Sequence, residues 1–324
     1  MMKKKALKIV KVVAIVLVLL GIIGSAALGK MIADQVMYQN KDNDTKSNSV
    51  KQLVDIWGYD LDGFNTRYTG TEISAVAEDG NVVPGTYFKA DEESDKYVVL
   101  VHGAGGDRVC VSPLAEQYLI RGYNCIAIDQ RGCGDNADDK VTFGINESKD
   151  VAAMVLYARN ELGASEVIVH GQSMGGQTVA IYASNVTPGD ANAADAVICD
   201  SPVPGMEYML RSVFADSDNE EDFYNAGTDY MIFVSKIASK LLYKVDYDDA
   251  DTIAVVANDM IPTMVIRSEK DQVCLPEKVQ EVYNNIGTDE KVIMSVDSAH
   301  IEGVIDDPEG YMNGVMDFLG TYGL

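Results

Sequence analysis

The chain has 324 residues, with 50 acidic and 26 basic side chains and a formal net charge of -24. Apolar residues make up 47% and charged residues 23%, values ordinary for a globular protein that exclude wholesale disorder. Six of the lysines lie in residues 1–30, which contain no acid, so the rest of the chain is strongly acidic. Because such a surface repels phosphate backbones, we expect no nucleic-acid partner.

The first 30 residues have the composition of a membrane segment. Lysines at positions 3, 4, 5, 8 and 11 precede an uncharged run of 18 residues from Val12 to Gly29. As a helix this run would extend about 27 Å, close to the thickness of the bilayer hydrocarbon. The positive-inside rule keeps the lysines cytoplasmic, which predicts a membrane anchor over residues 1–30 with the rest of the chain exported. The alternative is a signal peptide cleaved near Ser25-Ala26-Ala27, which would leave a secreted protein.

A polar linker is expected over residues 31–50, because its polar stretch Asn40–Ser49 has no apolar periodicity. The globular domain is then expected over residues 51–324. Five cysteines are irregularly spaced and without a CxxC pair, which predicts no disulfide framework but leaves a single pair open. Three scattered histidines offer no local metal-binding pattern, so we expect no metal and no cofactor.

Short apolar runs alternate with helical patterns along the domain, which predicts a mostly parallel sheet with helices on both faces, an α/β fold. An antiparallel hairpin, Thr71–Ala77 with Val82–Phe88, should precede it. The expected strands are Tyr97–Val101, Asn124–Asp129, Glu166–His170, Ala196–Asp200, Thr263–Arg267 and Val292–Val296. The expected helices are Ser112–Arg121, Glu147–Leu162, Met174–Ala183, Pro276–Asn285 and Glu309–Leu319.

Residues 202–260 interrupt this alternation with aromatic and acidic side chains. The pattern predicts a small helical insertion. Insertions between the strands of such sheets often form lids over active sites, so we expect a lid. An ordinary helical connection without a role in substrate choice is the alternative.

Gly171-Gln172-Ser173-Met174-Gly175 follows a predicted strand and opens a predicted helix. This G-x-S-x-G pattern in strand–turn–helix context is typical of a strained elbow that lifts a nucleophilic serine above a sheet. The small residues let the strand and helix backbones pass closely. We therefore expect Ser173 to be a nucleophile. A tight glycine turn with a serine helix cap is the alternative.

A serine nucleophile needs a base and an orienting carboxylate. His300 follows the last predicted strand and, by elimination among three histidines, is the expected base. His170 lies too close to Ser173 on the same strand, and we expect it to be packed below the elbow. Asp271 follows the preceding strand and is the expected carboxylate, with Asp200 and then Glu269 as rivals.

Backbone N–H groups should wait where an oxyanion forms. One expected donor is Met174, directly after the serine. The other should come from the loop His102-Gly103-Ala104-Gly105-Gly106, most plausibly Ala104, with the neighbouring glycines as alternatives. His102 is expected to be structural, bonded to the loop backbone.

Together these residues resemble the α/β-hydrolase family. The serine, aspartate and histidine occur in that family's order at positions 173, 271 and 300, and the H-G-x-G segment at 102–105 matches its oxyanion loop. Asp129-Gln130-Arg131-Gly132-Cys133-Gly134 resembles the family's D-x-R-G-x-G loop, in which the aspartate and arginine are structural. The resemblance covers residues 70–320. Among subfamilies the chain is similar to bacterial exported or membrane-tethered hydrolases of esterase- or acyl-peptidase-like type.

The expected function is that of a serine hydrolase cleaving a carboxylic ester through an acyl-enzyme on Ser173. Its partners would be a small-molecule or peptide acyl substrate and, through the N-terminal helix, a membrane. A peptidase, amidase or thioesterase with the same triad stays open, because a fold does not choose among these substrates. A non-catalytic binding domain on the same fold and acyl transfer to an alcohol are alternatives of other classes.

Overall fold

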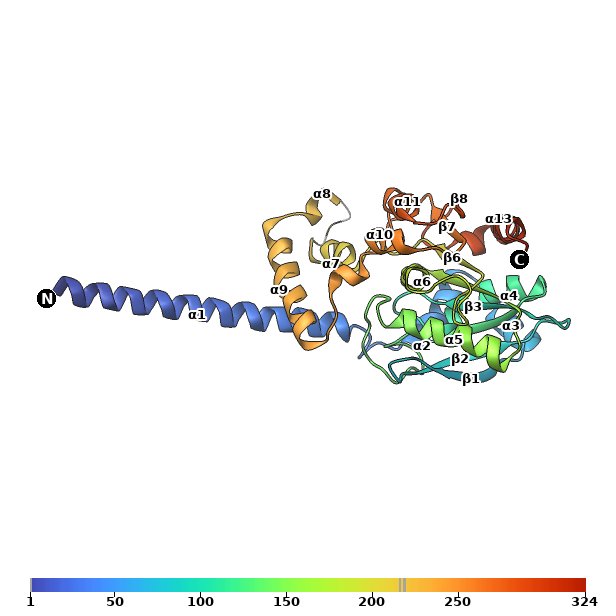
Figure 1. Ribbon diagram of the computed structural model, residues 1–324, viewed down its shortest axis with the longest axis horizontal. Coiled ribbons are helices and arrows are strands. Elements are labelled where there is room, and N and C mark those ends of the chain that lie inside the picture. Colours follow the sequence, from blue (N-terminus) through green and yellow to red (C-terminus); the bar gives the residue numbers. More distant parts are fainter. Residues whose placement is uncertain (1, 216, 218–219) are drawn as a thin grey trace. The chain divides into compact units, whose positions relative to one another are not determined.

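The computed structural model describes residues 2–215, 217 and 220–324. The chain divides into two compact units. A helical unit combines the chain up to Met37 with Leu210–Tyr247, and a sheet unit combines Tyr38–Met209 with Asp248–Leu324. Each unit is described separately below, with its elements labelled as in Figure 1.

The described part of the sheet unit is built on one eight-stranded sheet in the order β1-β2-β4-β3-β5-β6-β7-β8. Strand β2 is antiparallel to β1 and β4, and the remaining pairs are parallel. This confirms the predicted hairpin and the predicted parallel sheet. The strands are β1 (Thr71–Val76), β2 (Val82–Phe88), β3 (Lys96–Val101), β4 (Asn124–Ile128), β5 (Glu166–Gln172), β6 (Ala196–Asp200), β7 (Thr263–Ser268) and β8 (Lys291–Val296).

Helices cover both faces of this sheet (Figure 1). On one face, Val98 and Leu100 of β3 share a fully buried core with Tyr118 of α4 and Phe318 of α13. The alternate residues of β3 point to the opposite face, where α5 and α6 contact the strand. Burial on both faces is why the central strands are continuous apolar runs.

The sheet unit's helices agree with the predicted spans to within about two residues, except where no element was predicted. The longer helices are α4 (Ser112–Ile120), α5 (Glu147–Glu161), α6 (Met174–Asn185), α11 (Pro276–Asn285) and α13 (Pro308–Thr321). The shorter ones are α2 (Thr45–Val50), η1 (Lys51–Ile56), α3 (Leu61–Arg67), η2 (Arg108–Val111), α10 (Thr252–Val255), η4 (Val256–Asn258) and α12 (Gly303–Asp306).

Residues 31–50, predicted as a polar linker, are partly helical, because α1 runs on to Met37 and α2 begins at Thr45. Polar side chains of this segment bond to loops of the sheet unit. Ser49 Oγ accepts from the Asp107 N–H at 2.8 Å, and Thr45 Oγ1 accepts from the Gly134 N–H at 3.0 Å. Such long-range bonds order a segment that has no apolar periodicity of its own.

The loop after β4 is held by charges, as its resemblance to the D-x-R-G-x-G pattern implies. Arg131 is only 3% exposed and pairs with Asp150 at 2.7 Å and Asp79 at 2.8 Å. Asp129 is fully buried and accepts from the Arg108 N–H at 2.9 Å. The Asp150 and Asp79 carboxylates keep the pKa of Arg131 above its usual range. Arg131, Asp79, Asp150 and Asp129 thus bond to one another or to the loop backbone and not to Ser173.

The helical unit contains α1 (Met2–Met37), and Lys11–Met37 is long and apolar enough to cross a membrane. It also contains most of the predicted insertion. Helix α9 (Ala226–Leu242) of the insertion packs on α1. The insertion is helical, as predicted, and its role as a lid stays a prediction. Its elements are α7 (Met206–Ala215), which begins in the sheet unit, α8 (Glu220–Phe223), α9 (Ala226–Leu242) and η3 (Tyr247–Ala250).

Candidate active site

Ser173 stands at a sharp turn between β5 and α6. Its φ of 59° and ψ of -120° lie in a region that non-glycine residues rarely adopt. A side chain on Gly171 would meet the Gly175 carbonyl oxygen at 2.2 Å, and one on Gly175 would meet the Val101 carbonyl oxygen at 2.2 Å. The glycines are therefore needed for the strand, turn and helix to pass one another, as the elbow pattern predicts.

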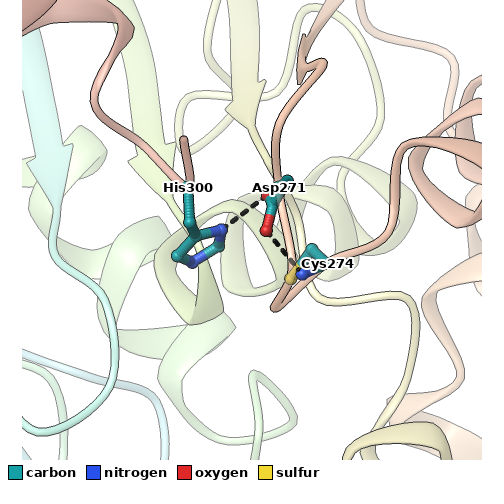
Figure 2. Close-up of side chains that lie close together, drawn as sticks. All are labelled: Asp271, Cys274 and His300. Atoms are coloured by element: carbon teal, nitrogen blue, oxygen red, sulfur yellow. Dashed lines mark hydrogen bonds and ion pairs between the residues drawn. The ribbon is translucent and has the colours of Figure 1, made fainter. Parts of the chain in front are cut away.

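The structure brings Ser173, His300 and Asp271 together. His300 Nε2 lies 2.8 Å from Ser173 Oγ, and His300 Nδ1 lies 2.7 Å from Asp271 Oδ2. Figure 2 shows the imidazole turned toward the carboxylate. Since a carboxylate only accepts, the Nδ1 proton points to Asp271, which leaves Nε2 free to accept the serine proton.

Asp271 is held in place by backbone donors. Its Oδ1 accepts from the N–H groups of Val273 and Cys274, each at 2.8 Å, while Oδ2 faces His300 (Figure 2). The carboxyl group is fully buried, whereas the His300 ring is 17% exposed. The two carboxylate oxygens thus have different partners: Oδ1 accepts from the loop backbone, and Oδ2 accepts from the imidazole.

The rival carboxylates are engaged elsewhere. Asp200 is fully buried and accepts from Gln172 Nε2 at 3.1 Å and from the Tyr311 hydroxyl at 2.9 Å. Burial raises the pKa of Asp200 above its ordinary value. Glu269 accepts from Arg267 at 2.6 Å near the surface. Asp271 is the carboxylate that contacts the His300 ring among the described residues.

The other two histidines have structural surroundings, as predicted. His102 Nε2 accepts from the Gln130 N–H at 3.1 Å, so its Nδ1 proton goes to the Gly103 carbonyl at 2.6 Å. His170 lies under the elbow between the hydroxyls of Tyr118 at 3.0 Å and Tyr311 at 3.1 Å. Burial lowers the pKa of His170 to about 3, so the ring is neutral.

The two expected oxyanion donors flank the serine. Met174 is the first residue of α6, so its N–H has no acceptor within the helix. The loop of His102–Gly106 runs beside Ser173: a side chain on Gly103 would lie 3.7 Å from Ser173 Oγ. Among the described residues the Ala104 N–H donates to no backbone or side-chain acceptor. Their action on an oxyanion stays a prediction.

A pocket of about 550 Å³ opens beside His300. One wall is the loop Ala104–Gly106, and another is Ile301 and Glu302. The remaining wall was missed by sequence reasoning, because it comes from the segment treated as linker and domain start: Asn48, Lys51, Gln52, Ile56 and Trp57. No motif marks this segment. Trp57 is the chain's one tryptophan, and its indole N–H donates to Glu302 at 3.2 Å.

Asp271, Cys274 and His300 also place three possible metal-ligand atoms within 4.8 Å of one another. Burial raises the pKa of the Cys274 thiol well above its ordinary value. The His300 nitrogen and the Asp271 oxygen are already bonded to each other. All five cysteines are free thiols in this structure.

Comparison with known proteins agrees with this architecture. Residues 96–227 match the family described as the alpha/beta hydrolase fold. A lipase of Psychrobacter immobilis is 25% identical, covering 69% of this chain and 74% of its own, and a carboxylesterase of Bacillus subtilis is 25% identical, covering 69% and 92%. A solved esterase of Pyrococcus furiosus superposes with a TM-score of 0.61 at 22% identity, covering 79% of this chain and 94% of its own.

The fold, the match to the family and these likenesses agree with one another. The chain therefore has the α/β-hydrolase fold, and the fold, the match over residues 96–227 and the esterase-named likenesses support a hydrolase. Its sheet, the sharp turn at Ser173 and the charged loop after β4 agree with the resemblance in the sequence.

Proposed function

We propose that the protein is a serine hydrolase that cleaves carboxylic esters through an acyl-enzyme on Ser173. The observation that carries the proposal is the unbroken hydrogen-bonded chain from Ser173 Oγ through His300 to Asp271, with contacts of 2.8 Å and 2.7 Å. The α/β-hydrolase fold and the family match over residues 96–227 support hydrolysis. The esterase and lipase names among the relatives favour an ester over an amide or thioester.

In the proposed reaction, Ser173 Oγ attacks the acyl carbon and its proton passes to His300 Nε2. The carbonyl oxygen becomes an oxyanion that accepts from the Met174 and Ala104 N–H groups. Collapse breaks the ester bond, and the departing alkoxide takes the proton from His300. Water then loses a proton to His300 and attacks the acyl-enzyme. The second tetrahedral intermediate collapses as His300 returns this proton to Ser173 Oγ, which releases the carboxylic acid. Asp271 stabilises the imidazolium in both halves.

The pocket beside His300 is the proposed place for the substrate's larger group. Besides the His300 ring, it is lined by aliphatic and aromatic carbons, two amide side chains, a lysine and the Glu302 carboxylate. We expect Gln52→Trp to fill the pocket and to lower kcat/KM for a hexanoate ester far more than for the matching acetate. Gln52→Ala is the matched control, with both esters cleaved as in the wild type. An equal loss for both esters in Gln52→Trp would contradict this assignment.

The experiment that tests the proposed function is labelling of the full chain with a fluorophosphonate probe. We expect labelling of the wild type and its loss in Ser173→Ala and His300→Ala, since the probe needs an activated serine. A panel of esters, amides and thioesters follows, with an added alcohol to detect acyl transfer. A folded wild-type chain that takes no label would favour a non-catalytic binding domain.

We also propose that α1 anchors the protein in a membrane with the sheet unit exported. The apolar run of α1 and the lysines before it support this orientation. The test is protease treatment of cells whose cell wall or outer membrane has been removed and whose cytoplasmic membrane is intact. Digestion of the sheet unit is expected, with α1 staying in the membrane pellet after a carbonate wash. A mature protein that begins after Ala27 would indicate a cleaved signal peptide instead.

A further inference from the structure

Helix α9 exposes a row of large apolar side chains to solvent. Tyr230, Phe233, Ile237 and Leu241 are 45%, 62%, 47% and 67% exposed. At about 100° per residue, these four positions fall within an arc of about 80° on one side of the helix. We call this row the outer stripe of α9. Contiguous exposed apolar surface of this kind marks a contact with a membrane or another protein.

The other two sides of α9 are different. Its buried side carries the small and apolar residues Ile232, Val234, Ser235, Ala238 and Ser239. Its charged side carries Asp229, Lys236 and Lys240 and lies next to the outer stripe. A helix with one packed side, one apolar side open to solvent and lysines beside it has the composition of a helix that lies in a membrane interface.

The contact between α9 and α1 determines how deep α9 would lie in a bilayer that α1 spans. The Tyr230 hydroxyl lies 2.6 Å from Ser25 Oγ. A side chain on Gly29 would meet the Val234 carbonyl oxygen at 2.3 Å, so the two backbones touch there. Further along, the Tyr243 hydroxyl donates to Asp34. Helix α9 therefore contacts α1 from Ser25 to Asp34, across the end of the apolar run at Gly29.

On the N-terminal side of this contact, α1 packs against no other described element of its unit. Its apolar residues from Val12 to Ile23 are exposed on every side, as expected for a helix whose surroundings are lipid. If the run from Val12 to Gly29 spans the hydrocarbon, Ser25 lies only about 6 Å inside its outer edge. Interfacial helices bury their apolar faces about 5–10 Å into this boundary. The outer stripe begins at that depth.

We propose that the outer stripe of α9 lies in the lipid interface beside α1, so that the insertion is a second membrane attachment of this enzyme. The inference rests on the anchor proposed above. It assigns the lipid bilayer as the partner, because Tyr230 of the stripe contacts Ser25, next to the exposed apolar residues Ile22 and Ile23 of α1. The charged side beside the stripe is polar and internally paired, Lys240 with Asp246 and Asp229 with Arg211, as expected where a helix faces the headgroup region.

The test uses the full chain in vesicles of phosphatidylcholine with one-fifth phosphatidylglycerol. A cysteine carrying an environment-sensitive NBD dye replaces Phe233, and the signal of the labelled unsubstituted chain is subtracted for Cys110. Asp229→Cys on the charged side of the same helix is the matched control. Leu19→Cys, in the middle of the apolar run, reports on the anchor itself.

At position 233, we expect spin-labelled lipids to quench the dye at least about twofold more than at position 229, and aqueous iodide to quench it less. Quenching by lipid at position 19 together with free access of iodide at position 233 would overturn the proposal while the anchor stands. Protection of position 233 from both quenchers would mean that protein, such as a second copy of the chain, covers the stripe, which also overturns it. No lipid quenching at position 19 would refute the anchor and this inference together.

Discussion

Asp271→Asn is the substitution that examines the proposed chemistry most sharply. In the wild type, Asp271 Oδ1 accepts two backbone N–H groups at 2.8 Å, and Oδ2 accepts the His300 Nδ1 proton at 2.7 Å. In the variant, the single amide oxygen must stay with the two backbone donors, so the amide NH₂ turns to His300. The imidazole then accepts at Nδ1 and carries its proton on Nε2, where it can no longer take a proton from Ser173.

The wrong tautomer should lower kcat by about 10⁴-fold, the loss typical of this exchange in a serine triad. That loss corresponds to about 5 kcal/mol of transition-state stabilisation. KM and the thermal unfolding midpoint should change little, because the two backbone bonds and the side-chain volume are kept. The assay is hydrolysis of p-nitrophenyl butyrate by the full chain in detergent, with substrate concentration varied so that kcat and KM are separated.

Glu269→Gln is the matched control, since Glu269 is a neighbouring acid on the same loop that pairs with Arg267 at 2.6 Å and makes no contact with His300. Its kcat should stay within about twofold of the wild type, as expected for a surface ion pair. A folded Asp271→Asn protein that keeps a tenth or more of the wild-type kcat would refute the orienting role of Asp271.

Three further predictions concern the scaffold. Ser49→Ala leaves the buried Asp107 N–H without its acceptor at 2.8 Å and should lower the free energy of unfolding by about 1–3 kcal/mol in urea titrations; an unchanged midpoint would mean that the segment is not held by this bond. Gly175→Ala forces a side chain against the Val101 carbonyl oxygen, 2.2 Å away, and should cost about 1–3 kcal/mol or more and abolish probe labelling, since backbone beside the elbow must move. His170 has a pKa lowered to about 3 by burial, so the unfolded chain binds a proton that the folded chain refuses. The resulting contribution to the free energy of unfolding is fully present above about pH 6.5 and is lost as the pH falls towards 3. The difference in free energy of unfolding between the wild type and His170→Gln should therefore shrink by about 3 kcal/mol from pH 7 to pH 4. A constant difference would contradict the neutral buried ring.

The sequence identified the strands and the elbow because both depend on local patterns. Strands buried on both faces must be continuous apolar runs, and the elbow must have glycines where side chains would meet backbone at 2.2 Å. The three proposed catalytic residues were chosen from the sequence because they follow strands that end at one rim. These expectations needed no knowledge of which segments meet in space, beyond the rule that parallel strands share an edge.

The choice among three carboxylates could not be made so firmly from the sequence. Asp200, Glu269 and Asp271 all follow strands of the sheet, and only the tertiary structure separates the acid that meets His300 from those held by Tyr311 and Arg267. The separation depends on contacts between residues far apart in the chain, for which no local pattern exists.

The same reason explains what the sequence missed altogether. The segment from Asn48 to Trp57 forms a pocket wall through polar bonds to distant loops, and its sequence resembles a linker because those bonds leave no periodicity. The pairing of α9 with α1 joins residues some 205 positions apart, such as Ser25 and Tyr230. Local patterns were enough to predict the sheet, the turn at Ser173 and an apolar helix suited to a membrane. The residues that surround these features could not be predicted in the same way, because they come from distant parts of the chain and leave no local pattern.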